Sequence, residues 1–587
     1  MKTPNFYVNF QVLSCGIFHY FVLILFLVYF QTPIQAQKAE PYDIIINEFM
    51  PDPLDTIGLP NSEFIELYNR STKTIDLEGF KFWNGKVKTI LPNFKLKPNN
   101  YVIIYTRKST VHFGNFGDTL PVAKLISLSN PGDTFYLESP ENLVIDAASY
   151  DISFYQNAKK ADGGWSLERI NINAPCLTTN WIASNDLKGG TPGQKNSVFT
   201  DVPDKIPPQL ISSFPVNDKK IILKFDKSLN KALASQPIHY QLDKNIDIAN
   251  VKVGSPMFDI VELSLNKPLQ KSTLYQLSIK TTLKDCQNTP LSMTTQIPIQ
   301  LPEKAESNDL IINELLMNPE TGGSRFVEIY NRSKKVVDLS ELKIADIVKG
   351  DVKNVTIQYA LFPEKYVVLT ENLLYIQTRY RAEKYKNHIV KNRLPTWYAD
   401  KGNVTLYTTQ GTKIIVIDSF DYDKNFHNPL LANTEGVSLE RIGHNEPTNN
   451  ASNWHSAAAS VAYATPGYQN SQYLIRSLAP ATKEIFTLEQ KTFSPDEDGF
   501  QDFLLLNYEV DKVGYFVNIF IFNIEGMLVK KLKINELLSS KGQFKWDGET
   551  DENVKAPVGA YIIYIELISP EGEVKKMKKT GILADKF

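Results

Sequence analysis

The sequence predicts an all-β fold in which several β-sandwich domains form an extended multidomain array. Short apolar runs alternate with turn signals through most of the chain, as at residues 101–105 and 134–137. No long stretch keeps the 3.6-residue periodicity of an amphipathic helix. At 587 residues the chain is long enough for about four domains of ordinary size.

Two long segments of the chain are the same module written twice. Similar short motifs occur in the same order in both segments, which indicates a duplicated domain. The matched stretches are residues 45–48 with 311–314, 63–71 with 325–333, 166–170 with 438–442, and 191–197 with 465–471. A chain built by duplication points to repeated β modules and away from one large catalytic unit.

The repeat and the linkers set the domain boundaries. The paired prolines Pro207 and Pro208 favour extended backbone and indicate a linker after the first module. The predicted segments are a signal peptide at 1–36, the first module at 41–198, a smaller β unit at 201–302, the second module at 307–473 and a C-terminal unit at 481–587.

The N-terminal segment predicts export. Lys2 precedes a nearly continuous apolar run at residues 17–30, which is short for a membrane span of about 20 residues. Ala36 then offers a small residue for cleavage, as in secretory signal peptides. The alternative is an uncleaved anchor. After signal removal we expect no transmembrane span and a location at the outer cell surface or outside the cell, with the periplasm as the alternative.

Composition excludes some partners and makes a prediction about the cysteines. The net charge is −2 and the pI is about 6.4, so the chain gives no strong nucleic-acid signal. Cys15 lies in the leader, while Cys176 and Cys286 fall in different predicted domains. We therefore expect Cys176 and Cys286 to be buried thiols.

The duplicated module resembles the lamin tail domain (LTD), an Ig-like β-sandwich also found in exported bacterial proteins. The resemblance rests on Ile-Asn-Glu at 46–48, Phe-Ile-Glu-Leu-Tyr-Asn at 64–69 and the closing Thr-Pro-Gly-Gln-Lys-Asn at 191–196. It implies binding or scaffolding and no catalysis. The middle unit is similar to the bacterial Ig-like domains of surface-layer and other exported proteins, on residues 207–208, 223–225 and 288–291.

The C-terminal unit is similar to the Ig-like domain of flagellar-hook-assembly proteins and to the C-terminal domains of gliding-motility-associated proteins. Residues 493–502, 546–548 and 557–564 carry this likeness. It implies a domain for secretion or attachment, recognised by the type IX secretion machinery. The whole chain then reads as tandem Ig-like β-sandwich domains.

A carboxylate loop in the C-terminal unit is the candidate metal site. Asp496, Asp498 and Asp502 alternate around Gly499, a pattern that can wrap oxygens around Ca²⁺. The alternative is a turn in which these aspartates bond nearby backbone N–H groups.

Two glutamates occur in both modules, Glu48 with Glu66 and Glu314 with Glu328. A carboxylate pair can act as acid and base in glycoside hydrolysis. A structural role is the preferred interpretation, in which these strand residues bond turn backbone or an arginine such as Arg70 or Arg169. We therefore expect no catalytic residue.

Histidines and aromatic residues give no compact site. The six histidines after the leader are expected at the surface: His112, His239, His388, His427, His444 and His455. Most aromatic residues should fill sandwich cores. The alternative is a protein- or carbohydrate-binding surface made by loop residues such as Trp83, Phe154, Tyr155, Trp397 and Tyr398.

These observations favour a non-enzymatic, exported, modular cell-surface protein that acts in adhesion, binding or envelope scaffolding. Its expected partners are an unknown protein or polysaccharide ligand at the cell surface and, through the C-terminal domain, the secretion machinery. The alternative is a carbohydrate- or nucleic-acid-binding accessory module of an extracellular hydrolase system. No cofactor is expected beyond the possible Ca²⁺.

Overall fold

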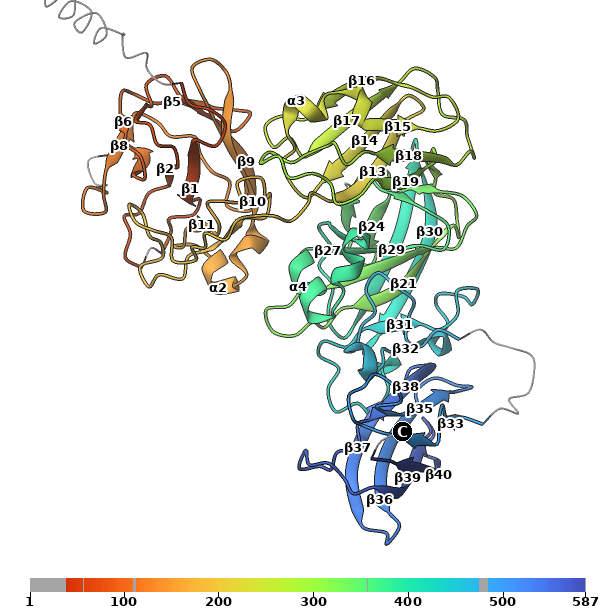
Figure 1. The fold of residues 1–587 in the computed structure, drawn as a ribbon. Coiled ribbons are helices and arrows are strands. Elements are labelled where there is room, and N and C mark those ends of the chain that lie inside the picture. Colours follow the sequence, from red (N-terminus) through yellow and green to blue (C-terminus); the bar gives the residue numbers. More distant parts are fainter. Residues whose placement is uncertain (1–37, 56, 109–111, 356, 475–483, 586–587) are drawn as a thin grey trace, which may run out of the picture. The chain divides into compact units, whose positions relative to one another are not determined.

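The computed structural model describes residues 38–55, 57–108, 112–355, 357–474 and 484–585, and the predicted signal peptide lies outside them. The chain divides into two compact units, Met1–Asp204 and Lys205–Phe587. Strands make up 41% of the chain and helices 7%, which confirms the predicted all-β class (Figure 1). Among the described helices, none is long and apolar enough to cross a membrane.

The first unit holds the first copy of the repeat, built on a six-stranded sheet and a four-stranded sheet. The six-stranded sheet has the order β12-β11-β1-β2-β7-β8, the four-stranded sheet has the order β10-β9-β4-β5, and β3 pairs with β6. The strands are β1 (Ile44–Met50), β2 (Phe64–Asn69), β3 (Ile75–Asp76), β4 (Lys81–Trp83), β5 (Lys88–Ile90), β6 (Lys95–Leu96), β7 (Tyr101–Thr106), β8 (Thr119–Val122), β9 (Gly132–Glu138), β10 (Val144–Asp151), β11 (Leu167–Arg169) and β12 (Trp181–Ala183). A short helix, α2 (Ala158–Ala161), precedes β11.

The core of this module lies between the two sheets. Alternate residues of the central strands face inward, as Phe49 and Ile65 do, because successive side chains of a strand point to opposite faces. Phe49 packs edge-on against Phe135 of β9 at 5.2 Å and against Trp181 of β12 at 4.8 Å. Every residue of β1 is nevertheless buried, so its second face is also covered.

The second unit begins with the smaller sandwich. Its sheets have the orders β13-β14-β17-β16 and β15-β18-β19. The elements are β13 (Leu210–Asn217), β14 (Lys220–Phe225), α3 (Lys231–Ala234), β15 (Tyr240–Leu242), β16 (Ile248–Val253), β17 (Ile260–Leu265), β18 (Tyr275–Ile279) and β19 (Thr295–Ile299). Inward-facing apolar residues such as Leu223, Leu263 and Leu277 form its core.

The second copy of the repeat has the same arrangement of large sheets as the first. Its six-stranded sheet runs β28-β27-β22-β21-β31-β32, its four-stranded sheet runs β25-β24-β29-β30, and β20-β23-β26 form a small sheet. The elements are β20 (Glu303–Lys304), β21 (Leu310–Leu316), β22 (Phe326–Asn331), β23 (Val337–Asp338), β24 (Lys343–Asp346), β25 (Asp351–Asn354), β26 (Ala360–Leu361), β27 (Tyr366–Thr370), α4 (Leu373–Arg379), β28 (Ile389–Lys391), β29 (Lys401–Gln410), β30 (Lys413–Asp423), β31 (Leu439–Arg441) and β32 (Trp454–Ser456).

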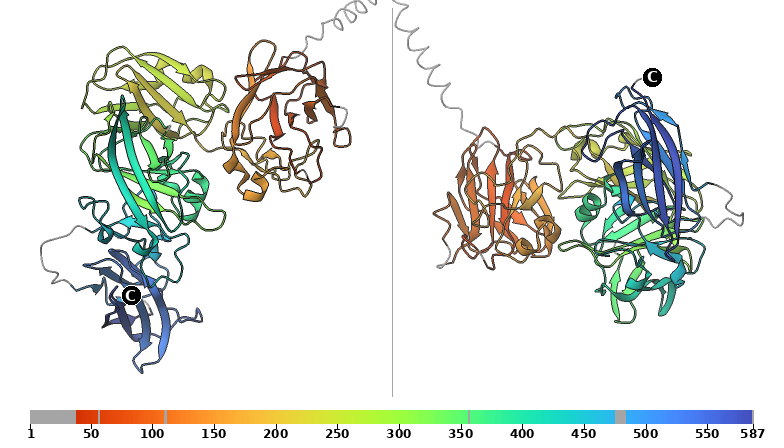
Figure 2. Two further views of the ribbon diagram at one scale, coloured as in Figure 1. Left: turned by 180° about the vertical axis from the view of Figure 1, so that it is seen from behind. Right: turned by 90° about the horizontal axis from the view of Figure 1, so that it is seen from below.

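The C-terminal domain is a sandwich of a three-stranded sheet, β33-β35-β38, and a five-stranded sheet, β34-β40-β39-β36-β37. Its strands are β33 (Phe486–Leu488), β34 (Thr492–Phe493), β35 (Leu504–Glu509), β36 (Phe516–Asn523), β37 (Leu528–Leu537), β38 (Lys541–Trp546), β39 (Gly559–Ile568) and β40 (Val574–Leu583). The long strands β36, β39 and β40 pair side by side in the large sheet (Figure 2).

The cysteines depart from the prediction. Cys176 and Cys286 are both disulfide-bonded, so the expectation of two thiols was wrong. That expectation rested on their positions in separate predicted domains. Position along the sequence does not say which sulfur atoms come within bonding distance.

Candidate functional site

Each copy of the repeat buries three glutamates side by side on its six-stranded sheet. In the first copy, Glu48 of β1 lies opposite Glu66 of β2 and opposite Glu168 of β11. Directly opposed residues share one face of a sheet, so the three carboxyl groups are neighbours. All three are 0% exposed. We call Glu48, Glu66 and Glu168, and their counterparts Glu314, Glu328 and Glu440, the carboxyl clusters.

A closing strap bonds to the first carboxyl cluster; the straps are residues 191–198 of the first copy and 465–472 of the second. Strap backbone N–H groups and hydroxyls donate hydrogen bonds to the glutamates, together with side chains of the sheet. In the first copy Glu48 accepts from Thr191 N (2.9 Å) and Ser166 Oγ (2.6 Å), Glu66 from Gly193 N and Asn47 Nδ2 (2.8 Å), and Glu168 from Thr191 Oγ1 (2.9 Å), Ser197 Oγ (2.8 Å) and Val198 N (3.1 Å).

The second copy repeats these bonds one for one. Glu314 accepts from Thr465 N (2.8 Å) and Ser438 Oγ (2.5 Å), Glu328 from Gly467 N (2.6 Å) and Asn313 Nδ2 (2.7 Å), and Glu440 from Thr465 Oγ1 (2.8 Å), Ser471 Oγ (2.7 Å) and Gln472 N (2.8 Å). The conserved geometry explains why the Thr-Pro-Gly and Asn-Ser motifs occur in both copies. These motifs are the part of each module that binds the carboxyl cluster.

The glycine of the strap is required by its close approach to the rest of the module. Gly193 has φ +79°, and a Cβ built there would lie 1.8 Å from the carbonyl oxygen of Phe116. Gly467 has φ +92°, and its Cβ would lie 2.9 Å from Cβ of Tyr385. Glycine alone adopts such a backbone without strain and leaves this space, so its N–H can reach the glutamate.

Burial raises the pKa of carboxyl groups in both clusters. Burial raises the pKa of Glu66 and of Glu314 from 4.5 to about 8. Burial, and then the facing Glu66 and Glu168, raise the pKa of Glu48 well above its ordinary value. Burial and then Glu314 do the same to Glu328. A buried, protonated carboxyl with satisfied oxygens stabilises structure, and its burial keeps substrate away.

The preferred interpretation of these glutamates is confirmed in part. They do bond turn backbone, as the sequence predicted. They do not bond the arginines named as candidates: Arg169 pairs with Asp146 at 2.5 Å, and Arg70 donates to the carbonyl of Tyr42 at 3.2 Å. The acid–base alternative has no support from a cluster that is wholly buried under the strap.

The sequence interpretation missed the third glutamate, Glu168 or Glu440. The signal was present, because Ser-Leu-Glu-Arg-Ile recurs in both copies. It also missed a buried ion pair that occurs in both copies, Asp146 with Arg169 and Asp418 with Arg441. Val-Ile-Asp at 144–146 recurs at 416–418 and marks the aspartate in the same way.

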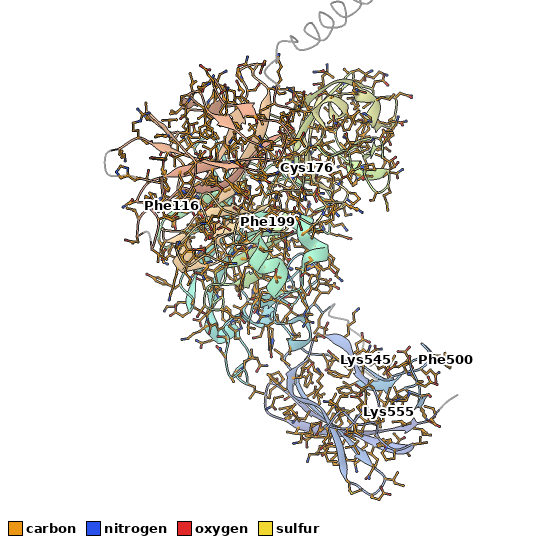
Figure 3. All side chains as sticks on the ribbon, turned by 60° about the vertical axis from the view of Figure 1, so that its left-hand side comes forward. Phe116, Cys176, Phe199, Phe500, Lys545 and Lys555 are labelled. Carbon is orange, nitrogen blue, oxygen red and sulfur yellow. The ribbon has the colours of Figure 1, made fainter. Side chains whose placement is uncertain are left out.

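The three aspartates of the candidate metal loop do converge. Their nearest carboxylate oxygens all lie within 4.8 Å of one another. The loop also makes the predicted turn bonds, since Asp502 accepts from the backbone N–H of Glu497 (2.8 Å) and of Gly499 (3.0 Å). Asp496 Oδ1 is buried and has no hydrogen-bond partner among the described residues. Phe500, a residue of this loop, is 59% exposed and is labelled in Figure 3.

The histidines are less exposed than predicted. His239 is 5% exposed, and burial lowers the pKa of His427 and of His444 from 6.5 to about 4. Burial also lowers the pKa of His388 and His455. The expectation of surface histidines was therefore wrong for His239, whereas the other four are partly exposed and His112 is exposed. Polar residues in loops are covered where neighbouring loops pack over them.

The loop aromatics divide between core and surface. Trp397 is 2% and Tyr155 4% exposed, and Phe154 packs against the first core, so these three make no binding surface. Tyr398 is 62% exposed, with Lys349 Nζ 3.3 Å from its ring centroid. Trp83 is partly exposed and lies beside Tyr136.

Comparison with protein families supports this architecture. The Lamin Tail Domain model matches residues 37–151 and 303–424, and the Bacterial Ig-like domain model matches residues 204–298. Both lamin-tail matches end before the third glutamate and the strap; the structure places the third glutamate on β11 or β31 of the six-stranded sheet. A search of curated proteins gave no significant match.

Several solved structures align with parts of the chain at low similarity. The N-terminal part of the bacterial S-layer protein SbsC is 14% identical with a TM-score of 0.17, and the alignment covers 37% of this chain and 44% of that one. CopC from Methylosinus trichosporium OB3b is 17% identical with a TM-score of 0.10, covering 14% and 74%. A tetra-tandem repeat of a large adhesion protein is 9% identical with a TM-score of 0.12, covering 92% and 98%. The chain thus spans less than half of the SbsC fragment.

No functional conclusion follows from structural similarity at this level. The family matches and the repeated carboxyl clusters carry the assignment of the domains. The chain contains two lamin tail domain regions and, between them, one bacterial Ig-like domain.

Proposed function

We propose that the chain is a non-enzymatic, exported, modular cell-surface protein that acts in adhesion, binding or envelope scaffolding. The observation that carries this proposal is that both duplicated carboxyl clusters have a structural role. Both bind a strap of their own module and are 0% exposed, so the residues that the duplication preserves maintain two binding or spacer modules. Lamin tail and bacterial Ig-like domains fit such a role.

Export is supported by the disulfide state of Cys176 and Cys286. Disulfides persist in oxidising compartments and are rare in the cytosol. The apolar segment at residues 17–30 supplies the matching export signal in the sequence. Alkylation of native protein from the host, before any reductant is added, should leave both cysteines unlabelled. Quantitative labelling of both would contradict the disulfide state and remove this support for export.

The C-terminal domain is proposed to direct secretion or attachment, with the secretion machinery as its partner. Support comes from the motif at residues 493–502, which forms the loop between β34 and β35. Fractionation of host cells, with mass spectrometry of both termini, tests this role. Protein at the outer surface or in the medium that starts near Gln37 and lacks the C-terminal domain is the expected result. Full-length protein in the periplasm would overturn it and leave an envelope scaffold.

An accessory module that binds carbohydrate or nucleic acid is the second candidate. One observation favours it: Trp83 and Tyr136 lie side by side on the outer face of the first module, with ring centroids 6.0 Å apart and Lys88 Nζ 3.9 Å from the Trp83 ring. The second module has Ala345 and Thr405 at the matching register positions. Trp83→Ala should reduce retention on insoluble polysaccharide if this pair binds sugar. Unchanged retention would remove this site.

The aspartate loop is proposed to hold Ca²⁺ through Asp496, Asp498 and Asp502. Its support is the convergence of three carboxylates together with the buried, unpartnered Oδ1 of Asp496. Bound Ca²⁺ would neutralise their repulsion and raise the stability of the C-terminal domain. Millimolar Ca²⁺ should raise the melting temperature of the full chain, and Asp498→Asn should abolish the increase. An unchanged wild-type melting temperature would leave the loop as a hydrogen-bonded turn.

A further inference from the structure

The outer face of the five-stranded sheet of the C-terminal domain carries a row of two aromatic residues between two lysines. Phe520 of β36 lies opposite Lys531 of β37 on one side and opposite Tyr564 of β39 on the other. Tyr564 lies opposite Lys578 of β40. The row Lys531–Phe520–Tyr564–Lys578 therefore crosses four adjacent strands in register.

The alternation of buried residues places this row on the face that points away from the core. Ile519 and Ile521 of β36 and Ile563 and Ile565 of β39 are all buried in the core of the domain. Phe520 and Tyr564 occupy the alternate positions and are partly exposed. Because side chains on one face of a sheet project together, the four side chains of the row are available to one ligand.

The apolar surface extends beyond the row on one side. Phe522 lies opposite both Leu528 and Ile562, and Leu528 is 43% exposed. The ring centroids of Phe520, Phe522 and Tyr564 lie 6.3 to 6.4 Å apart in each pair. Partly exposed aromatic rings at this spacing form a small platform bordered by cations.

The charge of this face is positive. Lys531 and Lys578 are exposed, and neither Nζ makes an ion pair or hydrogen bond within the described residues. Glu566, the carboxylate next to the row, lies 3.7 Å from Lys576 Nζ and accepts from the Tyr564 hydroxyl at 3.3 Å. At the sheet edge, Asp551 accepts from the backbone N–H of Lys531 at 3.0 Å. The two terminal lysines of the row remain for a negatively charged ligand.

We propose that this face binds a carboxylated polysaccharide, a polyuronate, across the four strands. Three strand spacings of about 4.8 Å give the row a length of about 14 Å, which suits a few linked pyranose rings. Aromatic rings pack against the C–H faces of sugars, and the lysines pair with uronate carboxylates at either end. Two lysines neutralise too few phosphates for useful nucleic-acid affinity, since that affinity grows with each phosphate contact.

The proposal concerns a surface distinct from Trp83, and it is a property of the chain that still carries the C-terminal domain. Affinity electrophoresis of the full chain tests it, with polygalacturonate in the gel and dextran as the neutral polymer. Polygalacturonate should retard the wild-type chain and dextran should not. Lys531→Gln with Lys578→Gln, and separately Phe520→Ala with Tyr564→Ala, should weaken the retardation at least about tenfold.

Lys575→Gln is the matched control. Lys575 lies opposite the buried Leu567, so its side chain starts from the other face of β40, and its loss should leave the retardation unchanged. Thermal unfolding checks that each variant is folded. The proposal is overturned if polygalacturonate does not retard the wild type, or if folded row variants are retarded as strongly as the wild type. Tighter binding of oligo(dT) than of polygalacturonate would overturn it in favour of a single-stranded nucleic-acid site.

Discussion

Each lamin-tail-like module contains its own carboxyl cluster, but the two modules use their straps differently. Beyond the first strap, the chain bonds to its own module, with Thr200 N donating to Ile170 O at 2.7 Å. The second strap bonds to the C-terminal domain, where Ser471 O accepts from Ser540 N at 2.8 Å and Gln472 Nε2 donates to Leu538 O at 3.0 Å. The same closing element thus finishes one module and, in the other, also docks a neighbouring domain.

The buried ion pair next to each cluster differs in the same way. In the second module Thr448 Oγ1 donates to Asp418 Oδ1 at 2.5 Å and accepts from Arg441 Nη2 at 2.5 Å. In the first module Asp146 Oδ1 is buried without a hydrogen-bond partner among the described residues. An unsatisfied buried oxygen costs free energy, so the second pair is the better completed of the two.

The largest difference should come from removing the third glutamate of one cluster. Glu440→Ala leaves Ser471 Oγ and Gln472 N without their acceptor, while Thr465 Oγ1 keeps Glu314 Oε2 at 3.1 Å. Two buried donors without partners should lower the free energy of unfolding of the second module by about 2–5 kcal/mol. Hydrogen exchange of the full chain should be faster through the second strap and unchanged through the first.

The reciprocal variant sharpens this comparison. Glu168→Ala should release the first strap and spare the second, because its partners Ser197 and Val198 belong to the first module. Glu168→Gln keeps an acceptor oxygen and should cost less than the alanine variant. Equal exchange in both modules after either alanine substitution would show that the clusters do not hold the straps.

The next largest difference between the two modules should be in how their stability depends on pH. Glu66 and Glu314 have a pKa of about 8 in the folded chain against 4.5 when exposed. Unfolding therefore releases protons above pH 4.5, and the stability of both modules should fall as pH rises from 4.5 towards 8. In the second module burial also lowers the pKa of His427 and His444 from 6.5 to about 4, so stability there should fall as pH drops below 6.5.

The second module should thus be most stable at a higher pH than the first. Hydrogen exchange across a pH series, corrected for intrinsic exchange rates, measures both modules in one chain. Replacing His427 and His444 by glutamine should reduce the loss on the acid side and leave the alkaline side unchanged. A shared optimum in the unmodified chain would argue against neutral buried histidines.

The sequence predicted the strands, the duplication and the structural role of the glutamates, because alternation and repetition are visible in the sequence itself. It could not predict which sheet faces are covered. A glutamate that alternates with a core residue along one strand, as Glu48 does with Phe49, has the pattern of a solvent-facing position. The strap that buries Glu48 arrives more than a hundred residues later, so Thr191 reaches it only in the folded chain.

The same reasoning applies to Trp397, which the sequence leaves open as part of a binding surface. Trp397 lies in a loop of the sequence, where an aromatic residue suggests a binding surface. In the structure its indole Nε1 donates to Asn403 O at 2.8 Å, and its ring joins the second core. An aromatic side chain with one polar atom is readily buried when a carbonyl is within reach. No local pattern reveals such a carbonyl in advance.

A smaller change should make the two ion pairs alike. Thr448→Val removes the hydroxyl between Asp418 and Arg441, so the second module would acquire the unpartnered oxygen that Asp146 has in the first. Loss of this hydroxyl should cost about 1–2 kcal/mol in the free energy of unfolding, measured by chemical denaturation of the full chain. Thr448→Ser keeps the hydroxyl and should cost less. If Thr448→Val costs nothing, the hydroxyl does not stabilise this ion pair.

The smallest effect should come from the strap residue that touches the C-terminal domain. Gln472→Leu removes the bonds from Nε2 to Ser456 O and Leu538 O, both 3.0 Å long. It also removes Oε1, which is buried without a hydrogen-bond partner, so the net loss should be only about 1 kcal/mol. The readout is hydrogen exchange of residues 536–541, which should speed up while β36 and β39 stay protected.

Val198 follows Ser197 in the first strap as Gln472 follows Ser471 in the second, and Val198→Leu is the matched control. It should leave exchange at residues 536–541 unchanged, because Val198 belongs to the first unit and its N–H bonds to Glu168 of that same unit. Equal acceleration by the two variants would mean that exchange at residues 536–541 reports general destabilisation. Acceleration by Gln472→Leu alone would show that one strap position, apolar in the first module and polar in the second, has become a docking contact through its side-chain amide.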